Sequence, residues 1–201
     1  MENEQVFRYI LILGLVIVLP IGFFHRFRSQ STGEKLDRRQ EGLFILVTLR
    51  PIGALRMLGI LCYVINPQWM SWSTITIPFW LRCTGVAIGI VSGTLVIIVF
   101  RTIGRNITDT VVTRKVHILI THGPYRWVRH PFYVAFFGVI VADSLVTANW
   151  FLGLTGVVCA LLIIRRTTIE ENKLIERFGD DYRAYREKTG KFFPRIRVRS
   201  N

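Results

Sequence analysis

Apolar residues are concentrated in four blocks along the chain, and most charged residues lie between these blocks. The apolar blocks cover residues 7–24, 43–65, 77–100 and 132–164. A helix that crosses a membrane needs about 20 apolar residues, so each of the first three blocks fits one crossing. The fourth block has a polar break at residues 147–149 and fits a tight hairpin of two short helices. The pattern predicts an all-α integral membrane protein with about five transmembrane helices.

The first apolar block could also belong to a secretory signal peptide. Such peptides begin with basic residues and end at a cleavage site with small residues. This chain begins with the acidic sequence MENEQ, and no small-residue cleavage site follows the block. We therefore interpret the first block as a retained transmembrane helix.

The chain has 201 residues and a formal net charge of +13, which in a soluble protein would suggest a nucleic-acid partner. The positions of the charges indicate a membrane protein instead. Of 26 Lys and Arg residues, 22 lie within residues 25–41, 101–130 and 165–201, and none lies within 66–76 or 147–149. Since positively charged loops stay in the cytoplasm, we expect the N-terminus outside and the C-terminus and active site inside. Anionic membrane lipids are the expected partners of this charge, and nucleic acid is not.

Five residues within the apolar blocks need separate interpretation. Arg50 and Arg56 interrupt the second block, where a buried arginine is costly and is usually paired or lines a cavity. Alternatively, the helix begins late and both side chains reach the cytoplasmic surface. Cys62, Cys83 and Cys159 have no metal-like spacing, and we expect small buried side chains rather than a disulfide or a metal site.

Charged, histidine and tyrosine residues are concentrated at the start of the fourth block, in the stretch HGPYRWVRHPFYVA, residues 122–135. Gly123-Pro124 favours a turn, because Gly tolerates unusual backbone angles and Pro fixes its own. Pro131 suits the first turn of a helix, where a missing N–H costs nothing. The unsatisfied N–H groups of such a turn favour an anionic group, and Arg129 adds a cation that can grip a carboxylate.

Three aromatic residues in the same stretch, Tyr125, Trp127 and Tyr133, offer ring faces to a planar base or a cation. A ligand with a carboxylate, an aromatic base and a positive centre would use all of these features, and S-adenosylmethionine has all three. The alternative is an aromatic and basic belt of the kind that is common at membrane surfaces. The residue pattern alone leaves both interpretations open.

The polar C-terminal segment begins as a continuation of the fifth helix. Gly179 is expected to end or bend this helix, and Pro194 to end regular structure near the tail. Apolar and aromatic residues recur at three- and four-residue steps, which predicts one helical face. These residues are Ile169, Leu174, Ile175, Phe178, Tyr182 and Tyr185.

Two segments, KVHILITHGPYRWVRHPFYVA and RRTTIEENKLIERFGDDYRAYREKTGKFFP, resemble the isoprenylcysteine carboxyl methyltransferase family of integral membrane enzymes. The matching elements lie within residues 115–194. In order, they are His-x-Leu-x-x-x-Gly-Pro-Tyr, Arg-His-Pro-x-Tyr, a helical hairpin, Arg-x-x-x-Glu-Glu and Phe-Gly-x-x-Tyr-x-x-Tyr. Phospholipid N-methyltransferases share the Arg-His-Pro and paired-Glu pattern.

The resemblance implies S-adenosylmethionine as the cofactor and assigns site residues by position. Arg166 and Glu170, four residues apart on one helical face, are the expected catalytic residues on the acceptor side. Eukaryotic members have Gln where this chain has Thr110, so the resemblance carries no cofactor contact over to that position. The expected cofactor-binding residues are His117, Ile118, Leu119, Ile120, Tyr125, His130, Pro131, Phe132 and Tyr133.

Two sets of residues within these segments have alternative interpretations. His117, His122 and His130 are five and eight residues apart, a spacing that fits no compact metal motif. Methyl transfer needs no metal, so we expect no metal site. Glu170 and Glu171 could belong to a solvated helix start that balances the neighbouring arginines.

The predicted function is S-adenosylmethionine-dependent methyl transfer to a lipophilic acceptor, first of all the carboxylate of an isoprenylcysteine-like substrate. A carboxylate is ionised near neutral pH and needs no general base, so Arg166 would hold it and Glu170 would orient Arg166. A phospholipid amine or a small thiol is the alternative acceptor, and an amine would need Glu170 as a base. Less favoured are an NADPH-dependent sterol-type reductase, whose family members are much longer, and a membrane protein without activity.

We expect residues 1–201 to form a single membrane methyltransferase domain. Its first part, residues 1–100, would supply three transmembrane helices. The catalytic part, residues 101–201, would contain the helical hairpin and the C-terminal helix. The sequence gives no prediction of an oligomeric state.

Overall fold

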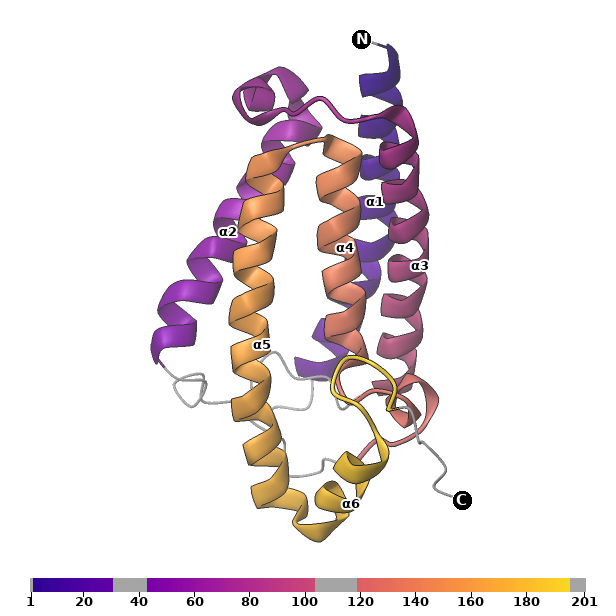
Figure 1. The fold of residues 1–201 in the computed structure, drawn as a ribbon, viewed down its shortest axis with the longest axis vertical. Helices are drawn as coiled ribbons and strands as arrows, with labels where there is room; N and C mark the ends of the chain where they lie inside the picture. Colours follow the sequence, from indigo (N-terminus) through magenta and orange to yellow (C-terminus); the bar gives the residue numbers. More distant parts are fainter. Residues whose placement is uncertain (1, 31–42, 104–118, 196–201) are drawn as a thin grey trace.

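The computed structural model describes residues 2–30, 43–103 and 119–195. In this part of the chain, long helices form an elongated bundle whose members alternate in direction (Figure 1). The elements are α1 (Glu2–Gln30), α2 (Leu43–Ile65), η2 (Pro67–Ser73), α3 (Phe79–Ile103), η4 (Gly123–Arg126), α4 (Pro131–Thr147), α5 (Trp150–Phe178) and α6 (Asp180–Lys188). The all-α prediction is confirmed, and the long helices coincide with the predicted apolar blocks.

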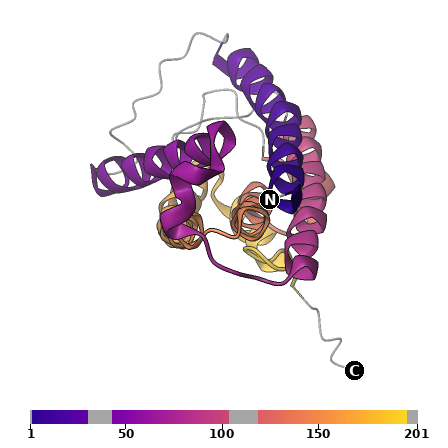
Figure 2. The same ribbon diagram turned by 90° about the horizontal axis from the view of Figure 1, so that it is seen from above.

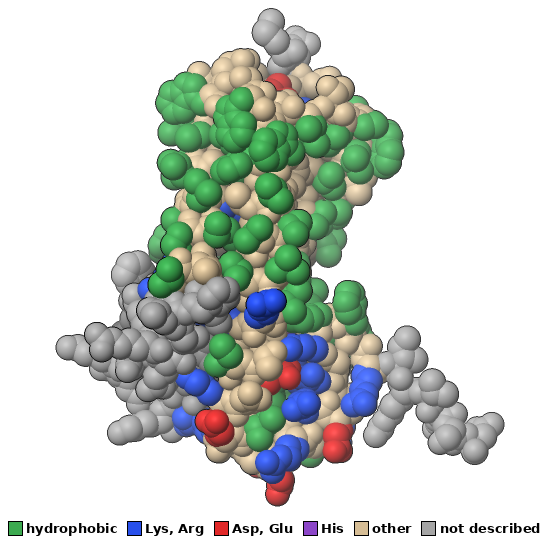
Figure 3. Space-filling view, turned by 60° about the vertical axis from the view of Figure 1, so that its left-hand side comes forward, with side chains coloured by type: hydrophobic (Ala, Val, Ile, Leu, Met, Phe, Trp, Pro, Cys, Tyr) green, Lys and Arg blue, Asp and Glu red, His purple; other side chains and the backbone are tan. Residues whose placement is uncertain are grey.

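Within the described residues, four helices, α1, α2, α3 and α5, are long and apolar enough to cross a membrane, and α4 is a shorter apolar helix of 17 residues. Seen from above, α4 lies in the middle, with α1 and α3 on one side and α2 and α5 on the other (Figure 2). Hydrophobic side chains cover the upper part of the surface, and charged side chains gather at the lower end around α6 (Figure 3). The chain is therefore a multi-pass membrane protein.

The predicted polar break is the turn of the α4–α5 hairpin. Ala148 adopts a left-handed conformation with φ 47°, which ends α4. Asn149 caps α5, because its side-chain oxygen accepts a 3.1 Å hydrogen bond from Leu152 N. The Asn149 amide also donates to Ser73 Oγ at 2.8 Å, so η2 covers this turn.

Small residues allow α3 and α4 to pack closely. A Cβ atom at Gly85 would lie 2.7 Å from Leu145 Cβ, and one at Gly138 would lie 2.1 Å from Ser92 Oγ. Close approach of backbones at small residues is a common basis of helix association in membranes. This contact fixes α4, and hence its first turn, against the bundle.

Arg56 forms a buried ion pair in the interior of the bundle. Its guanidinium donates to Asp143 of α4 and to the Leu152 carbonyl of α5. Gly156 leaves room for this group, since a Cβ atom there would lie 2.9 Å from Arg56 Nη1. Of the two interpretations for the arginines in this block, the paired one holds for Arg56. Arg50 lies at an exposed position.

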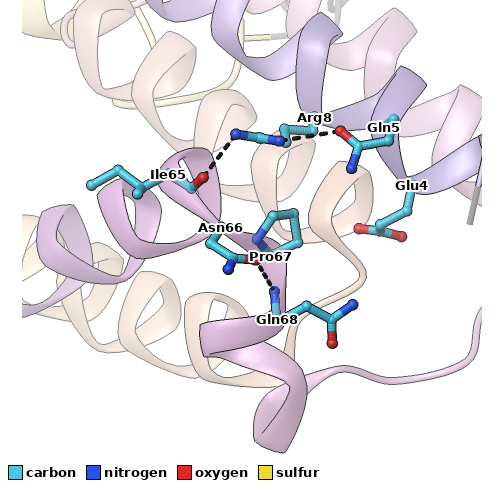
Figure 4. A pocket seen from close by; sticks show the side chains of 7 residues that line it. All are labelled: Glu4, Gln5, Arg8, Ile65, Asn66, Pro67 and Gln68. Atoms are coloured by element: carbon cyan, nitrogen blue, oxygen red, sulfur yellow. Dashed lines mark hydrogen bonds between the residues drawn. The ribbon is translucent and has the colours of Figure 1, made fainter.

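A second polar cluster lies at the end of the bundle that contains the N-terminus. Arg82 Nη1 binds Glu4 at 2.8 Å, and Arg82 Nε donates to Val146 O at 3.0 Å. Tyr63 donates to Glu4 from α2, so this cluster joins α1, α2, α3 and α4. A cavity of about 360 Å³ lies beside it (Figure 4). Its lining residues are Glu4, Gln5, Arg8, Ile65, Asn66, Pro67 and Gln68.

Gly179 separates α5 from α6, as predicted. Its φ of 53° is in the left-handed region, which ends α5 and turns the chain. After α6 the chain returns to the start of α4 (Figure 1). There Val128 and Gly190 form a parallel bridge, so the tail of the chain lies beside the Arg-His-Pro element.

Candidate functional site

The Arg-His-Pro element, residues 129–131, lies at the N-terminal end of α4, which we also call the entrance of α4. This is the opposite end of the bundle from the cavity of Figure 4. His130 precedes the helix, and the buried Pro131 is its first residue, as predicted. The His130 carbonyl accepts hydrogen bonds from Tyr133 N and Val134 N, both at 3.1 Å. The side chains of His130 and Tyr133 are thereby held at the first turn of α4.

Glu170 brings the two predicted halves of the site together. Its Oε1 atom accepts a 2.6 Å hydrogen bond from the Tyr133 hydroxyl and a 3.1 Å bond from Arg166 Nε. Its Oε2 atom lies 3.8 Å from His130 Nδ1. The first turn of α4 and the end of α5 thus meet at one carboxylate, which is largely buried with a side-chain exposure of 17%.

Aromatic rings extend this cluster along the first turn of α4. The His130 and Tyr133 rings are stacked with centroids 5.7 Å apart. Phe132 contacts Tyr133 at 5.9 Å between centroids and Phe100 of α3 at 5.5 Å. These rings supply planar, apolar surface next to the Glu170 carboxylate.

Tyr125 lies in η4, the short turn that precedes the Arg-His-Pro element. Gly123 opens this turn with φ 61°, and a Cβ atom there would lie 3.0 Å from Thr102 Cγ2. The Tyr125 carbonyl accepts a 2.6 Å hydrogen bond from the Tyr185 hydroxyl. Burial raises the pKa of the Tyr125 phenol above its usual value, and the charges of Tyr185 and Glu170 raise it further. Tyr125 is therefore neutral at physiological pH and within electrostatic reach of Glu170.

The remaining predicted residues are only partly covered by the structure. Leu119 and Ile120 are half-buried in the segment that leads into η4. His117 and Ile118, predicted to bind the cofactor, lie outside the described residues, as does Thr110.

Glu171 belongs to the site although only Glu170 was assigned to it. The Glu171 side chain is 10% exposed, and its Oε1 atom binds Arg129 Nε at 2.8 Å and His130 Nε2 at 3.1 Å. A solvated position is therefore wrong for this residue. Ile163, Thr167 and Glu171, four residues apart, share the inward face of α5, but their spacing alone does not show that this face is buried.

Arg129 was expected to offer its guanidinium to an anionic ligand. In the structure, the guanidinium is bound to Glu171 and to the carbonyl oxygens of Arg186 and Thr189. Its partners come from α5 and from the end of α6. Arg129 therefore links parts of the protein, and the sequence pattern did not reveal these partners.

Comparisons with known proteins point to one family. Residues 85–176 match the model of the isoprenylcysteine carboxyl methyltransferase (ICMT) family. The chain is 33% identical to the mouse (Mus musculus) protein-S-isoprenylcysteine O-methyltransferase over 138 residues, which are 66% of this chain and 47% of the mouse protein. It is also 34% identical to methanethiol S-methyltransferase 1 of Bradyrhizobium diazoefficiens over 70 residues, 35% of this chain and 24% of that protein.

The fold is similar to that of a solved relative. A structure of the eukaryotic intramembrane Ras methyltransferase ICMT matches with a TM-score of 0.54 and 22% identity. The match covers 96% of this chain and 64% of the solved chain. The chain spans about half the length of the curated mouse relative that it matches.

Proposed function

We propose that this chain is a member of the isoprenylcysteine carboxyl methyltransferase family and that it methylates a lipophilic acceptor in the membrane with S-adenosylmethionine. The preferred acceptor is the carboxylate of an isoprenylcysteine-like molecule. One observation carries this proposal, the contact of Tyr133 and Arg166 with the same Glu170 oxygen. It joins the cofactor-side residues to the acceptor-side residues within one cluster.

The chemistry of the side chains fits S-adenosylmethionine, which supplies an activated methyl group when it is bound. The first turn of α4 is the positive end of the helix dipole, which favours a carboxylate. The rings of Tyr125, Phe132 and Tyr133 suit an adenine base, and the Glu170 carboxylate suits a positive centre. His117, Ile118, Leu119, Ile120, His130 and Pro131 are proposed to complete this side of the site.

The acceptor side is proposed to consist of Arg166 and Glu170. Arg166 can grip a carboxylate with two parallel hydrogen bonds, because its guanidinium is planar. Glu170 holds Arg166 Nε at 3.1 Å and so fixes the direction of this grip. A carboxylate acceptor is already ionised, so these residues need to position it and not to deprotonate it.

A small thiol is the second candidate acceptor. The 34% identity to a methanethiol S-methyltransferase favours it over the phospholipid amine. Glu170 would then have to accept the thiol proton, since the thiolate is the nucleophile.

We propose that the lower end of the bundle in Figure 1, with the Arg-His-Pro element and α6, faces the cytoplasm. The charge distribution supports this orientation, because Lys and Arg gather in the segments at that end (Figure 3). The N-terminus would then lie outside. Within a single domain, residues 101–201 would form the catalytic part and receive the cofactor from water and the acceptor from the membrane.

A radiolabelled methyl-transfer screen tests this function. Purified protein is incubated with labelled S-adenosylmethionine and one acceptor of each class, namely a prenylcysteine, a phospholipid amine and methanethiol. We expect label in the prenylcysteine methyl ester, which base releases as methanol. Label in the thioether alone would establish the second candidate, and transfer to none of the three would contradict the proposal.

A further inference from the structure

Glu171 is a buried carboxylate with two partners on one oxygen. Arg129 Nε and His130 Nε2 both bind its Oε1 atom, at 2.8 and 3.1 Å. A charge at this depth is costly unless it is paired and hydrogen-bonded. Because the two partners are consecutive residues immediately before α4, Glu171 fixes the entrance of α4 to α5.

Arg129 carries this connection onward to the end of α6. Its Nη1 atom donates to Arg186 O at 3.1 Å and also to Thr189 O. The last carbonyl groups of a helix have no partner within the helix, and a cation there also interacts favourably with the helix dipole. One guanidinium therefore joins the Glu171 carboxylate to the C-terminal end of α6.

The segment after α6 lies across the same entrance, and we call residues 189–192 the C-terminal strap. Gly190 O accepts from Arg129 N at 2.8 Å, and Lys191 O accepts from His130 N at 3.1 Å. Gly190 N donates to Trp127 O at 3.3 Å. The strap is thus hydrogen-bonded along the residues that lead into α4.

The strap also places an aromatic ring over the site. The Phe192 ring lies 5.8 Å from the His130 ring and 5.6 Å from the Phe137 ring, centroid to centroid. A Cβ atom at Gly190 would come within 1.6 Å of Phe193 O, so the bend of the strap requires glycine. His130 is consequently in contact with Glu171 of α5, Tyr133 of α4 and Phe192 of the strap.

A buried hydroxyl marks the same region. Tyr182 of α6 is 1% exposed, and its hydroxyl has no hydrogen-bond partner among the described residues. A buried hydroxyl without a partner is costly. The Glu171 and Arg129 charges are its electrostatic neighbours, so this part of α6 is packed around the same ion pair.

We propose that Glu171 is a positioning residue, which through Arg129 and His130 holds the C-terminal strap closed over the cofactor side of the site. The identity of the ligand in this inference rests on the proposed function. The connection from Glu171 through Arg129 to the strap does not. Glu171 contacts the Arg129 and His130 side chains, and Arg129 contacts backbone carbonyl groups, so in this proposal both residues act on the cofactor through His130. Cofactor binding and strap closure are then one coupled event.

The test compares Glu171→Gln with Glu176→Gln, a control at an exposed position on the same helix. Gln keeps the shape and one acceptor oxygen but removes the charge. Hydrogen exchange of the full-length protein in detergent reports opening of the strap, because Gly190 N, Arg129 N and His130 N are all bonded there. Exchange at these amides should become about tenfold faster in Glu171→Gln and stay unchanged in the control.

Binding of S-adenosylhomocysteine is measured on the same preparations. Its affinity should fall about tenfold in Glu171→Gln, while the KM for the acceptor stays within about twofold. In the wild-type protein the ligand should slow exchange of the strap, and in the variant it should not. Faster strap exchange with unchanged ligand affinity would reduce Glu171 to a structural role and overturn the proposal, as would unchanged strap exchange.

A second variant covers the case in which Glu171→Gln does not fold. Arg129→Lys keeps the charge, but Arg129 binds Glu171 through Nε and the two carbonyl groups through Nη1, and a compact ammonium cannot reproduce this fork. It should loosen the strap to the same degree, and the double variant should be no worse than either single one. Additive effects of the two substitutions on strap exchange would contradict the proposed connection between Glu171 and the strap. If the wild-type protein binds no S-adenosylhomocysteine, the proposed function fails, while strap exchange without ligand still decides whether Glu171 holds the strap.

Discussion

The Tyr133 hydroxyl donates a 2.6 Å hydrogen bond to Glu170 Oε1, across 37 positions of sequence. Arg166 Nε reaches the same oxygen atom from 3.1 Å. We propose Tyr133 for the cofactor side and Glu170 for the acceptor side, so this bond marks the boundary of the two proposed binding regions. It holds the first turn of α4 against the end of α5.

Replacing this tyrosine tests the boundary directly. Tyr133→Phe removes one hydrogen bond to a charged group, which is typically worth about 1.5–3 kcal/mol. We expect methyl transfer to fall by about tenfold or more, because Glu170 then has fewer contacts to fix its position. Tyr9→Phe, at an exposed tyrosine of α1, serves as the control. Single-turnover methyl transfer measures the effect, and a rate equal to that of the control would contradict it.

Arg166 should affect the acceptor and not the cofactor. Arg166→Ala should leave the affinity for S-adenosylhomocysteine within about threefold, which is roughly 0.7 kcal/mol. It should reduce methyl transfer about a hundredfold, or roughly 2.7 kcal/mol of transition-state stabilisation. The neighbouring exposed Arg165, changed to Ala, is the control.

The type of contact that Arg166 makes is tested by a conservative change. Arg166→Lys should restore little activity if two parallel hydrogen bonds hold the acceptor carboxylate, because Lys cannot reproduce them. Large recovery would mean that only the charge matters. Loss of cofactor affinity in folded Arg166→Ala would show that this arginine belongs to the cofactor side.

The buried pair of Arg56 and Asp143 should show a characteristic stability pattern. Arg56→Leu or Asp143→Leu alone should destabilise the protein by about 3–5 kcal/mol, because each leaves an unpaired charge in the interior. The double variant should be less destabilised than either single one. Thermal unfolding in detergent measures this, and additive losses would show that the pair is not coupled.

The proposed orientation is tested by labelling single cysteines in a background that lacks Cys62, Cys83 and Cys159. Ser31→Cys and Ser200→Cys should react with membrane-impermeant thiol reagents only after permeabilisation. Ser71→Cys, in η2 at the end of the bundle that contains the N-terminus, should react in intact cells. The reverse pattern would refute an N-terminus outside and a C-terminus inside.

Much of the fold could be predicted because its determinants are local. The hydropathy blocks specify the long helices, Pro131 specifies where α4 begins, and Gly179 specifies where α5 ends. The polar residues 147–149 interrupt the fourth block, which made the hairpin visible in the sequence. The link from η2 to the hairpin turn through Ser73 and Asn149 was not predicted, because it joins residues 76 positions apart.

The candidate site was only partly predictable for the same reason. The resemblance to the family's motifs assigned Tyr133, Arg166 and Glu170, which the structure brings together. Spacing alone could not decide the environment of Glu171, since adjacent helical residues differ by about 100° and only the packing partner reveals which side is buried. The engagement of Arg129 with the end of α6 likewise depends on how the tail folds back.

Binding of S-adenosylhomocysteine to the detergent-purified protein is the most direct test of the central claim. The ligand should raise the melting temperature in a concentration-dependent way. At a ligand concentration of a hundred times its Kd, the free energy of unfolding should rise by about 2.7 kcal/mol. Tyr125→Ala and His130→Ala should weaken this effect, because they remove the aromatic surface of η4 and the residue at the entrance of α4. A shift in the wild-type protein that is reduced in both variants is the predicted result. Absence of measurable binding at millimolar ligand would contradict the assignment of this chain as a methyltransferase.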